Sequence, residues 1–135
     1  MIERLLLTLF LFAVGIAVYR LYCRRQMRCA EAQSQVDPLL IDRVPGIPTI
    51  VYFTTPTCAP CRLQQTPVLD RLMADMGADG MRLIRVDATV DPDAAARWGV
   101  FSVPTLFVLD QAGQPRKVFN GVVGLEQLKQ ELLAS

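Results

Sequence analysis

From residue 47 onward the sequence alternates between short apolar runs and segments with helical periodicity. The apolar runs are rich in β-branched residues and predict strands at residues 47–54, 81–86, 105–109 and 116–120. The periodic segments predict helices at residues 60–76, 91–99 and 125–133. This order of elements predicts an α/β layer sandwich, in which helices cover a four-stranded mixed sheet.

Turn and capping residues support these boundaries. Asp91 is expected to cap the second helix with Pro92 at its first position, and Gly77 and Gly80 are expected to end the first helix. Residues 112–115 carry a turn signal, so the last two strands are expected to form an antiparallel hairpin. Apolar residues recur near helical spacing in the first helix at Leu63, Val68, Leu69, Leu72 and Met76.

The N-terminal part of the chain carries a long apolar run at residues 5–22, with Arg20 as its only charge. As a helix this run would span about 27 Å, close to the thickness of the hydrocarbon core of a bilayer. Arg20 can extend toward the headgroups, and Tyr19 and Tyr22 suit the membrane interface. The sequence therefore predicts one N-terminal transmembrane helix. The alternatives are a buried core helix and a cleaved signal peptide. A cleavage site should follow the apolar run closely, but the only small-x-small triplet after the run, residues 30–32, lies beyond four arginines.

Basic residues near the two ends of the apolar run predict its orientation. Arg20, Arg24, Arg25 and Arg28 lie at or after its end, whereas only Arg4 and the amino terminus lie before it. This bias predicts a single-pass protein whose domain lies in the cytoplasm, with the exported side as the alternative.

The composition after the apolar run predicts the division of the chain. The sequence turns polar at residue 31, and proline breakers at residues 37–38 and 45–46 lie on either side of a short apolar patch at 39–41, which indicates a linker with about one helical turn. We therefore expect a transmembrane anchor with a basic flank at residues 1–30, the linker at 31–46, and one domain at 47–135.

The formal net charge of +1, the absence of His and the presence of four Cys limit the chemistry. A charge this small offers no long-range attraction for nucleic acid. Without His, catalysis must depend on Cys, carboxylates, Lys or Arg, and we expect no metal site and no bound cofactor. Cys23 and Cys29 match no zinc-ligand spacing and are interpreted as incidental thiols, or as an acylation site at Cys23.

Cys58 and Cys61 lie where the first predicted strand passes into the first predicted helix. Unpaired backbone N–H groups and the positive end of the helix dipole would stabilise a thiolate at Cys58, which makes it the expected attacking thiol. Cys61 follows one helical turn later, close enough to form a disulfide and to release a mixed-disulfide intermediate. The alternatives are buried structural thiols or half of a metal site, which would need two further ligands.

Several separate features between residues 47 and 133 resemble the thioredoxin family. The family's usual Cys-Gly-Pro-Cys appears as Cys-Ala-Pro-Cys at residues 58–61, and the following helix carries Pro67, as thioredoxin helices do. Residues 91–100 and 102–105 are similar to the family's run up to its cis-proline, and Gly121 fits ahead of the last helix. A lone Cys-x-x-Cys is a weak signal, but with a strand-to-helix junction and a following Val-Pro-Thr it is strong.

The resemblance implies a thioredoxin-like fold and a thiol–disulfide oxidoreductase of the protein-disulfide reductase type, with Cys58 and Cys61 as the catalytic pair. It assigns the cis-proline to Pro104, and a folded loop can hold a cis X–Pro bond at a cost of about 0.5–1 kcal/mol. The implied partners are protein thiols and disulfides, which the predicted anchor would place at the membrane, and an upstream electron donor similar to a thioredoxin reductase. The alternative is a non-catalytic binding or assembly module that uses the groove beside Pro104. The implied substrate-binding residues are Ala59, Pro60, Val103 and Pro104, of which Val103 would pair through its backbone with the extended substrate.

Two positions depart from the family pattern. Thr57 stands where thioredoxins usually place Trp, and Tyr52 stands where they bury an Asp that helps to take the proton of the resolving cysteine. A tyrosine is a poor proton acceptor at neutral pH, so we expect slower general reductase activity but intact disulfide exchange. Arg85 matches the basic neighbour of that Asp. Tyr52 and Trp98 are both expected in the core.

Overall fold

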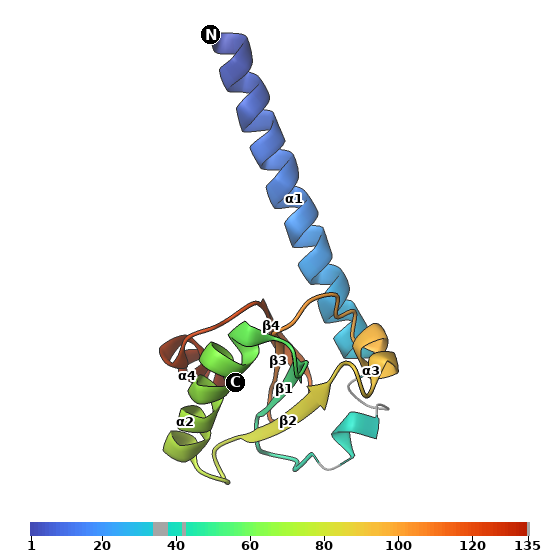
Figure 1. The fold of residues 1–135 in the computed structure, drawn as a ribbon, viewed down its shortest axis with the longest axis vertical. Helices are drawn as coiled ribbons and strands as arrows, with labels where there is room; N and C mark the ends of the chain where they lie inside the picture. Colours follow the sequence, from blue (N-terminus) through green and yellow to red (C-terminus); the bar gives the residue numbers. More distant parts are fainter. Residues whose placement is uncertain (34–37, 42, 135) are drawn as a thin grey trace.

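A computed structural model describes residues 1–33, 38–41 and 43–134. It consists of a long N-terminal helix, α1 (Ile2–Gln33), and an α/β domain that packs against the C-terminal end of this helix (Figure 1). A short 3-10 helix at Pro38–Leu40 precedes the first strand of the domain.

Four strands form one mixed sheet in the order β2, β1, β3, β4. Their bounds are Thr49–Thr54 for β1, Arg82–Asp87 for β2, Thr105–Leu109 for β3 and Pro115–Asn120 for β4. β1 pairs with β2 in parallel and with β3 antiparallel, and β3 pairs with β4 in an antiparallel hairpin. The predicted four-stranded mixed sheet is therefore confirmed, with every strand close to its predicted bounds.

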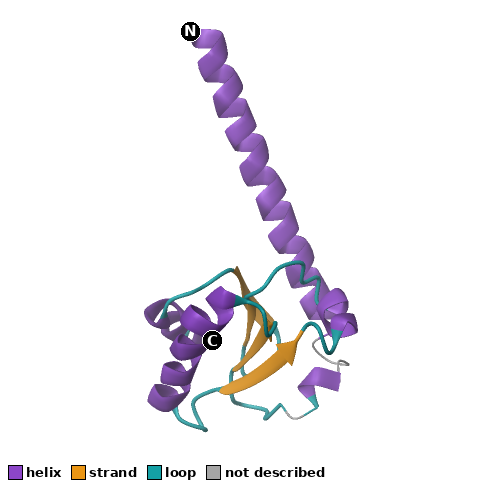
Figure 2. Ribbon diagram, viewed as in Figure 1, coloured by secondary structure: helices purple, strands orange, loops and turns teal. Residues whose placement is uncertain are grey.

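Helices cover both faces of the sheet (Figure 2). α2 (Thr66–Met76) and α4 (Leu125–Leu133) lie on one face, while α3 (Pro92–Arg97) and the last turns of α1 lie on the other. Successive residues of a strand point to opposite faces, so Ile50 packs toward α2 and α4, and Val51 packs toward α3. β1 is thus buried on both sides, which explains its continuous apolar sequence.

The helical segment after β1 begins with a π-helical turn, Cys61–Gln65, before α2 starts at Thr66. Leu63 lies off the inner side of this segment and is 74% exposed, although it belongs to the apolar pattern of the sequence. The inner side is instead formed by residues one turn apart: Cys61, Gln65, Leu69 and Leu72. A cysteine and a glutamine therefore occupy the core positions nearest the start of this helix.

Two helix ends form as the sequence predicts. Asp91 Oδ1 accepts a hydrogen bond from the Ala94 N–H at 3.1 Å, and Pro92 lies in the first turn of α3. α2 ends at Gly77, whose φ of 74° lies in the left-handed region that favours glycine. The Asp91 cap and Gly77 act on the adjacent backbone, so they set the helix ends in the folded domain as the sequence predicts.

The first two thirds of α1 project away from the domain (Figure 1). Residues 1–21 are exposed, and the helix is long and apolar enough to cross a membrane by length and composition. The alternative of a buried core helix is therefore wrong for this segment.

The last turns of α1 belong to the domain. Ala30 is buried in the cluster that contains Trp98 and Phe107, and Met27 packs against the same cluster. α1 continues to Gln33, so the first residues of the predicted linker are helical. Residues 34–37 and 42 of that linker lie outside the described residues.

Candidate active site

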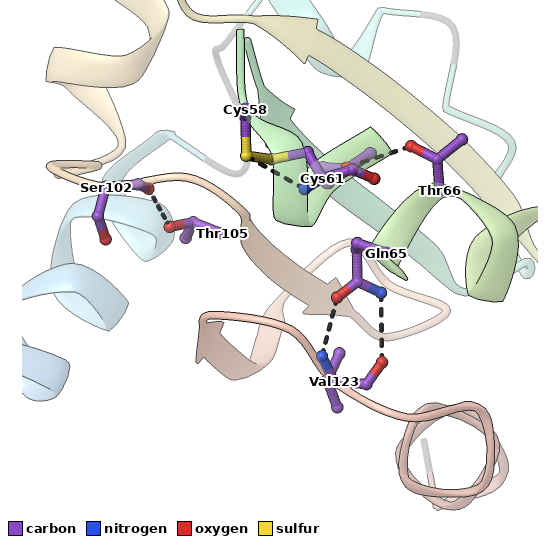
Figure 3. The surroundings of a disulfide bond; sticks show 8 residues. Cys58, Cys61, Gln65, Thr66, Ser102, Thr105 and Val123 are labelled. Atoms are coloured by element: carbon purple, nitrogen blue, oxygen red, sulfur yellow. Dashed lines mark hydrogen bonds between the residues drawn. A yellow bond between two sulfur atoms is a disulfide. The ribbon is translucent and has the colours of Figure 1, made fainter. Parts of the chain in front are cut away.

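Cys58 and Cys61 form a disulfide at the junction between β1 and the π-helical turn, with their Cα atoms 5.3 Å apart (Figure 3). The backbone N–H of Cys61 donates a hydrogen bond to Cys58 Sγ at 3.2 Å. A backbone donor at the start of a helix is the arrangement expected to stabilise a thiolate at Cys58 once the disulfide is reduced. The site therefore combines a redox-capable pair with a donor aimed at the first sulfur.

The two cysteines differ in their access to solvent. Cys58 is 9% exposed, whereas Cys61 is fully buried at 0%. Ala59 and Pro60, which separate them, are both exposed. Cys58 is therefore the more exposed of the two cysteines, and Cys61 has no contact with solvent.

The peptide bond between Val103 and Pro104 is cis, which confirms the assignment of the cis-proline. Val103 is half-buried and packs against the core cluster that contains both cysteines. The carbonyl of Pro104 accepts a hydrogen bond from Gly121 N–H at 2.9 Å, and Thr105 Oγ1 donates to the carbonyl of Ser102 at 2.6 Å (Figure 3). The cis-proline loop is thus held beside the disulfide, with the loop before α4 next to it.

Tyr52 occupies the position of the family's buried Asp and is itself fully buried, as expected. Its hydroxyl donates a hydrogen bond to the carbonyl of Cys61 at 3.3 Å and lies 3.4 Å from Thr66 Oγ1. Arg85 pairs with Tyr52 in the β1–β2 register, but its guanidinium binds Asp70 at 2.6 Å on the surface. The hydroxyl of Tyr52 therefore supports the backbone of the π-helical turn.

Comparison with known proteins agrees with this geometry. The family model for thioredoxin matches residues 38–134. The chain belongs to the thioredoxin family. It is 33% identical to thioredoxin of Alicyclobacillus acidocaldarius over 85 residues, which cover 63% of this chain and 78% of that protein. It is 36% identical to thioredoxin 1 of Synechococcus elongatus over 77 residues, covering 57% of this chain and 70% of that protein.

Solved structures show the same fold. A structure described as thioredoxin-2, a component of malaria parasite protein secretion machinery, matches with a TM-score of 0.61 at 21% identity, covering 66% of this chain and 84% of that one. Together with the Cys58–Cys61 disulfide, membership of the family makes this chain a thiol–disulfide oxidoreductase of protein disulfides.

A polar contact that the sequence analysis missed joins the active-site helix of this thioredoxin-family domain to the loop before α4. Gln65 is buried, its Nε2 donates to the carbonyl of Val123 at 3.3 Å, and its Oε1 accepts from Val123 N–H at 2.8 Å (Figure 3). Gln65 follows Cys61 by one turn, and no local sequence signal marks it. Its role depends on a loop that lies 58 residues away in sequence.

Phe101 is a second residue that the sequence analysis missed. It lies shortly before the cis-proline, is 74% exposed, and its ring is 5.9 Å from the ring of Tyr22 on α1. The contact links the active-site loops to the segment of α1 where the apolar run ends.

The other two cysteines are separate from the disulfide. Cys23 and Cys29 are both free thiols, half-buried on α1, and Cys23 Sγ lies 3.9 Å from Asn120 Nδ2. Within the described residues, no group of three or more His, Cys, Asp or Glu side chains is placed to hold a metal ion.

Proposed function

We propose that this chain is a membrane-anchored oxidoreductase that reduces disulfides of proteins lying at the bilayer surface. Residues 1–30 would form the anchor with its basic flank and residues 47–135 the catalytic domain, joined by residues 31–46. Cys58 is the attacking thiol and Cys61 the resolving thiol. The substrate-binding surface comprises Ala59, Pro60, Val103 and Pro104.

The reaction passes two electrons from the reduced pair to the substrate. The Cys58 thiolate attacks one sulfur of the substrate disulfide, so a Cys58–substrate bond forms, the substrate S–S bond breaks, and the leaving thiolate takes a proton. The Cys61 thiol then loses its proton and attacks Cys58 Sγ, which releases the second substrate thiol and forms the Cys58–Cys61 disulfide. A thiol electron donor, similar in role to a thioredoxin reductase, must reduce this disulfide before the next cycle.

The observation that carries the membrane part of the proposal is the position of the disulfide relative to α1. The start of the π-helical turn, the cis-proline loop and the loop before α4 all lie at the end of the domain from which α1 projects (Figure 1). The contact between Phe101 and Tyr22 supports the same placement, because Tyr22 ends the apolar run. If α1 spans a bilayer, the catalytic face is turned toward its surface.

The side of the membrane follows from the arginines around the end of the apolar run, which favour the cytoplasm. There, thiols are kept reduced, so the pair would work as a reductant with a cytoplasmic donor. Substrates on that side would be cysteine pairs in segments of membrane proteins that lie next to the bilayer.

The test is to trap substrates with the full-length Cys61→Ser variant in its native membranes. Removing the resolving thiol leaves the first attack intact, so disulfide-linked adducts through Cys58 should accumulate and should contain integral membrane proteins. The matched control is Cys58→Ser combined with Cys61→Ser, which should form none. Adducts confined to soluble proteins would contradict the membrane part of the proposal. If the double variant still binds the same partners without a covalent bond, the domain acts as a binding module instead.

A further inference from the structure

A groove of about 880 Å³ runs between the last turns of α1 and the edge strand β4. Its lining is strongly basic, since two separate elements contribute cations to it. These are Arg20, Arg24 and Arg28 from α1 and Arg116 and Lys117 from β4. Glu31 is the only acidic residue among the lining residues, and it already has an interaction of its own.

The three arginines of α1 form one row because residues four apart lie on the same face of a helix. Over eight residues this row extends for about 12 Å along the helix axis. β4 brings its two cations to the same groove from more than 85 residues further along the chain. Two ion pairs among the described residues, Arg85–Asp70 and Lys129–Asp75, use none of the groove's cations. Arg116 donates to the carbonyl of Ala134 at 3.5 Å, and Lys117 Nζ lies 5.9 Å from the centre of the Phe119 ring. Both of these partners are uncharged, so these contacts leave the positive charge of the two β4 side chains in place for an anion.

An apolar hollow continues the groove along α1 toward the N-terminus. It is lined by Leu11, Phe12, Gly15 and Ile16, and it shares Tyr19 and Arg20 with the basic groove. Gly15 has no side chain, and nothing lies within 4 Å of the position that a Cβ would take there. The surface thus changes from apolar to basic at Tyr19 and Arg20, which are near the end of the apolar run.

We propose that this continuous surface binds an anionic phospholipid, with the phosphate in the basic groove and an acyl chain along the hollow at Gly15. The inference rests on the proposed membrane insertion of α1. Arginine binds phosphate oxygens with two parallel hydrogen bonds, and basic side chains beside a bilayer are attracted to anionic lipids. An acidic peptide would match the charge of the groove but not the apolar hollow that continues it.

The bound lipid would also touch the catalytic end of the domain. Asn120, Gly121, Val122 and Val123 also line the groove. Gly121 donates to the carbonyl of Pro104, and Val123 is bound by Gln65 of the active-site helix. A headgroup in the groove therefore lies against the loop that supports the cis-proline, which would hold the substrate-binding face at the lipid surface.

The test uses the purified full-length chain in a neutral detergent, with lipids that remain bound counted by native mass spectrometry. Dioleoylphosphatidylglycerol and dioleoylphosphatidylcholine are offered at equal concentration, and we expect at least about tenfold preference for the anionic lipid. Arg24→Gln combined with Lys117→Gln should remove most of this preference. The matched control removes two exposed arginines outside the groove, Arg71→Gln with Arg82→Gln, and should keep it.

Three results would overturn the lipid site: equal retention of the two lipids, an equal loss in the control variant, or displacement of the lipid by millimolar inorganic phosphate. Preferential binding of an acidic peptide over phosphatidylglycerol, lost in the Arg24 and Lys117 variant, would assign the groove to a peptide instead. Alkaline extraction of membranes and disulfide reductase activity are measured on the same samples. They separate a failure of the anchor or of the catalytic pair from a failure of the lipid site.

Discussion

At the scale of single residues, the two sulfurs of the active site differ in exposure and in hydrogen bonding. Cys58 Sγ accepts a hydrogen bond from a backbone N–H and Cys58 is 9% exposed, whereas Cys61, the first residue of the π-helical turn, is fully buried. A thiolate is the nucleophile in disulfide exchange, so the difference supports the proposal that Cys58 makes the first attack.

This asymmetry predicts the order of alkylation. When the reduced chain meets a limiting amount of iodoacetamide at neutral pH, Cys58 should be modified at least about tenfold faster than Cys61, because it is both reachable and stabilised as a thiolate. Peptide mapping by mass spectrometry distinguishes the two, and also separates them from Cys23 and Cys29. Equal rates at Cys58 and Cys61 would contradict the assignment of roles.

Tyr52 stands where the family buries an Asp, and the Tyr52→Phe variant shows whether the tyrosine hydroxyl contributes to catalysis or to stability. Tyr52→Phe removes the donor to the Cys61 carbonyl, so the free energy of unfolding should fall by about 1 kcal/mol. The rate of disulfide reduction should change less than about threefold, because a tyrosine hydroxyl is a poor proton acceptor at neutral pH. Urea denaturation and a reductase assay measure the two effects. A large loss of rate with unchanged stability would instead place the hydroxyl in proton transfer.

Some of these residues could be predicted from sequence and others could not. Asp91 and Pro104 act through the local backbone, so a short motif is sufficient to identify them. The contact of Tyr52 with Cys61 and the contact of Gln65 with Val123 depend on how distant segments meet in the fold. No spacing in the sequence carries that information.

At the scale of elements, α1 has two parts with different surroundings. Gln26, at 1% exposure, forms a reciprocal amide pair with Asn120 of β4, at 3.0 and 2.8 Å, and its Nε2 lies 3.3 Å from the carbonyl of Gly99. Such a buried polar network positions one element against another because each partner is costly to leave unpaired. The last turns of α1 are therefore fixed to the domain. Because α1 is one continuous helix, this contact also sets the direction in which the apolar run projects from the domain.

Gln26→Ala should loosen this connection. The free energy of unfolding should fall by about 1–3 kcal/mol, because the half-buried Asn120 loses its amide partner. Hydrogen exchange of residues 22–32 should become faster, while exchange in β1 changes little. Arg25→Ala, at an exposed position of the same helix, is the matched control and should leave both measurements unchanged. Unchanged exchange in the Gln26 variant would mean that other contacts hold α1 in place.

The elements also show where sequence patterns lose accuracy. Strand and helix identities were predictable because the apolar runs and caps are strong, and residues 105–109 and 125–133 match the observed bounds of β3 and α4. The π-helical turn was not predictable. Leu63 is exposed because it lies two residues from both Cys61 and Gln65, on the opposite side of the turn from these buried side chains. The continuation of α1 into the predicted linker was missed because Met27 and Ala30 find their apolar neighbours only in the folded domain.

At the scale of the whole molecule, the proposed orientation in the membrane is open to direct test. The excess of arginine after the apolar run predicts that the domain lies in the cytoplasm. After treatment of intact cells with a permeant reductant, an impermeant maleimide should fail to label Cys58, and it should label Cys58 once the membrane is opened. Strong labelling in intact cells, with a cytoplasmic control protein unlabelled, would move the domain and its substrates to the exported side.

The central claim is that the Cys58–Cys61 pair carries out disulfide exchange on proteins, and the most direct test is catalysed reduction of a protein disulfide by dithiothreitol. The full-length chain in detergent is used, since the last turns of α1 form part of the domain core. The wild type should accelerate the reaction well above background, and Cys58→Ser should return the rate to background because it removes the attacking sulfur. Variants at Cys23 or Cys29 should retain the wild-type rate. If Cys58→Ser reduces the protein disulfide as fast as the wild type, the account is contradicted.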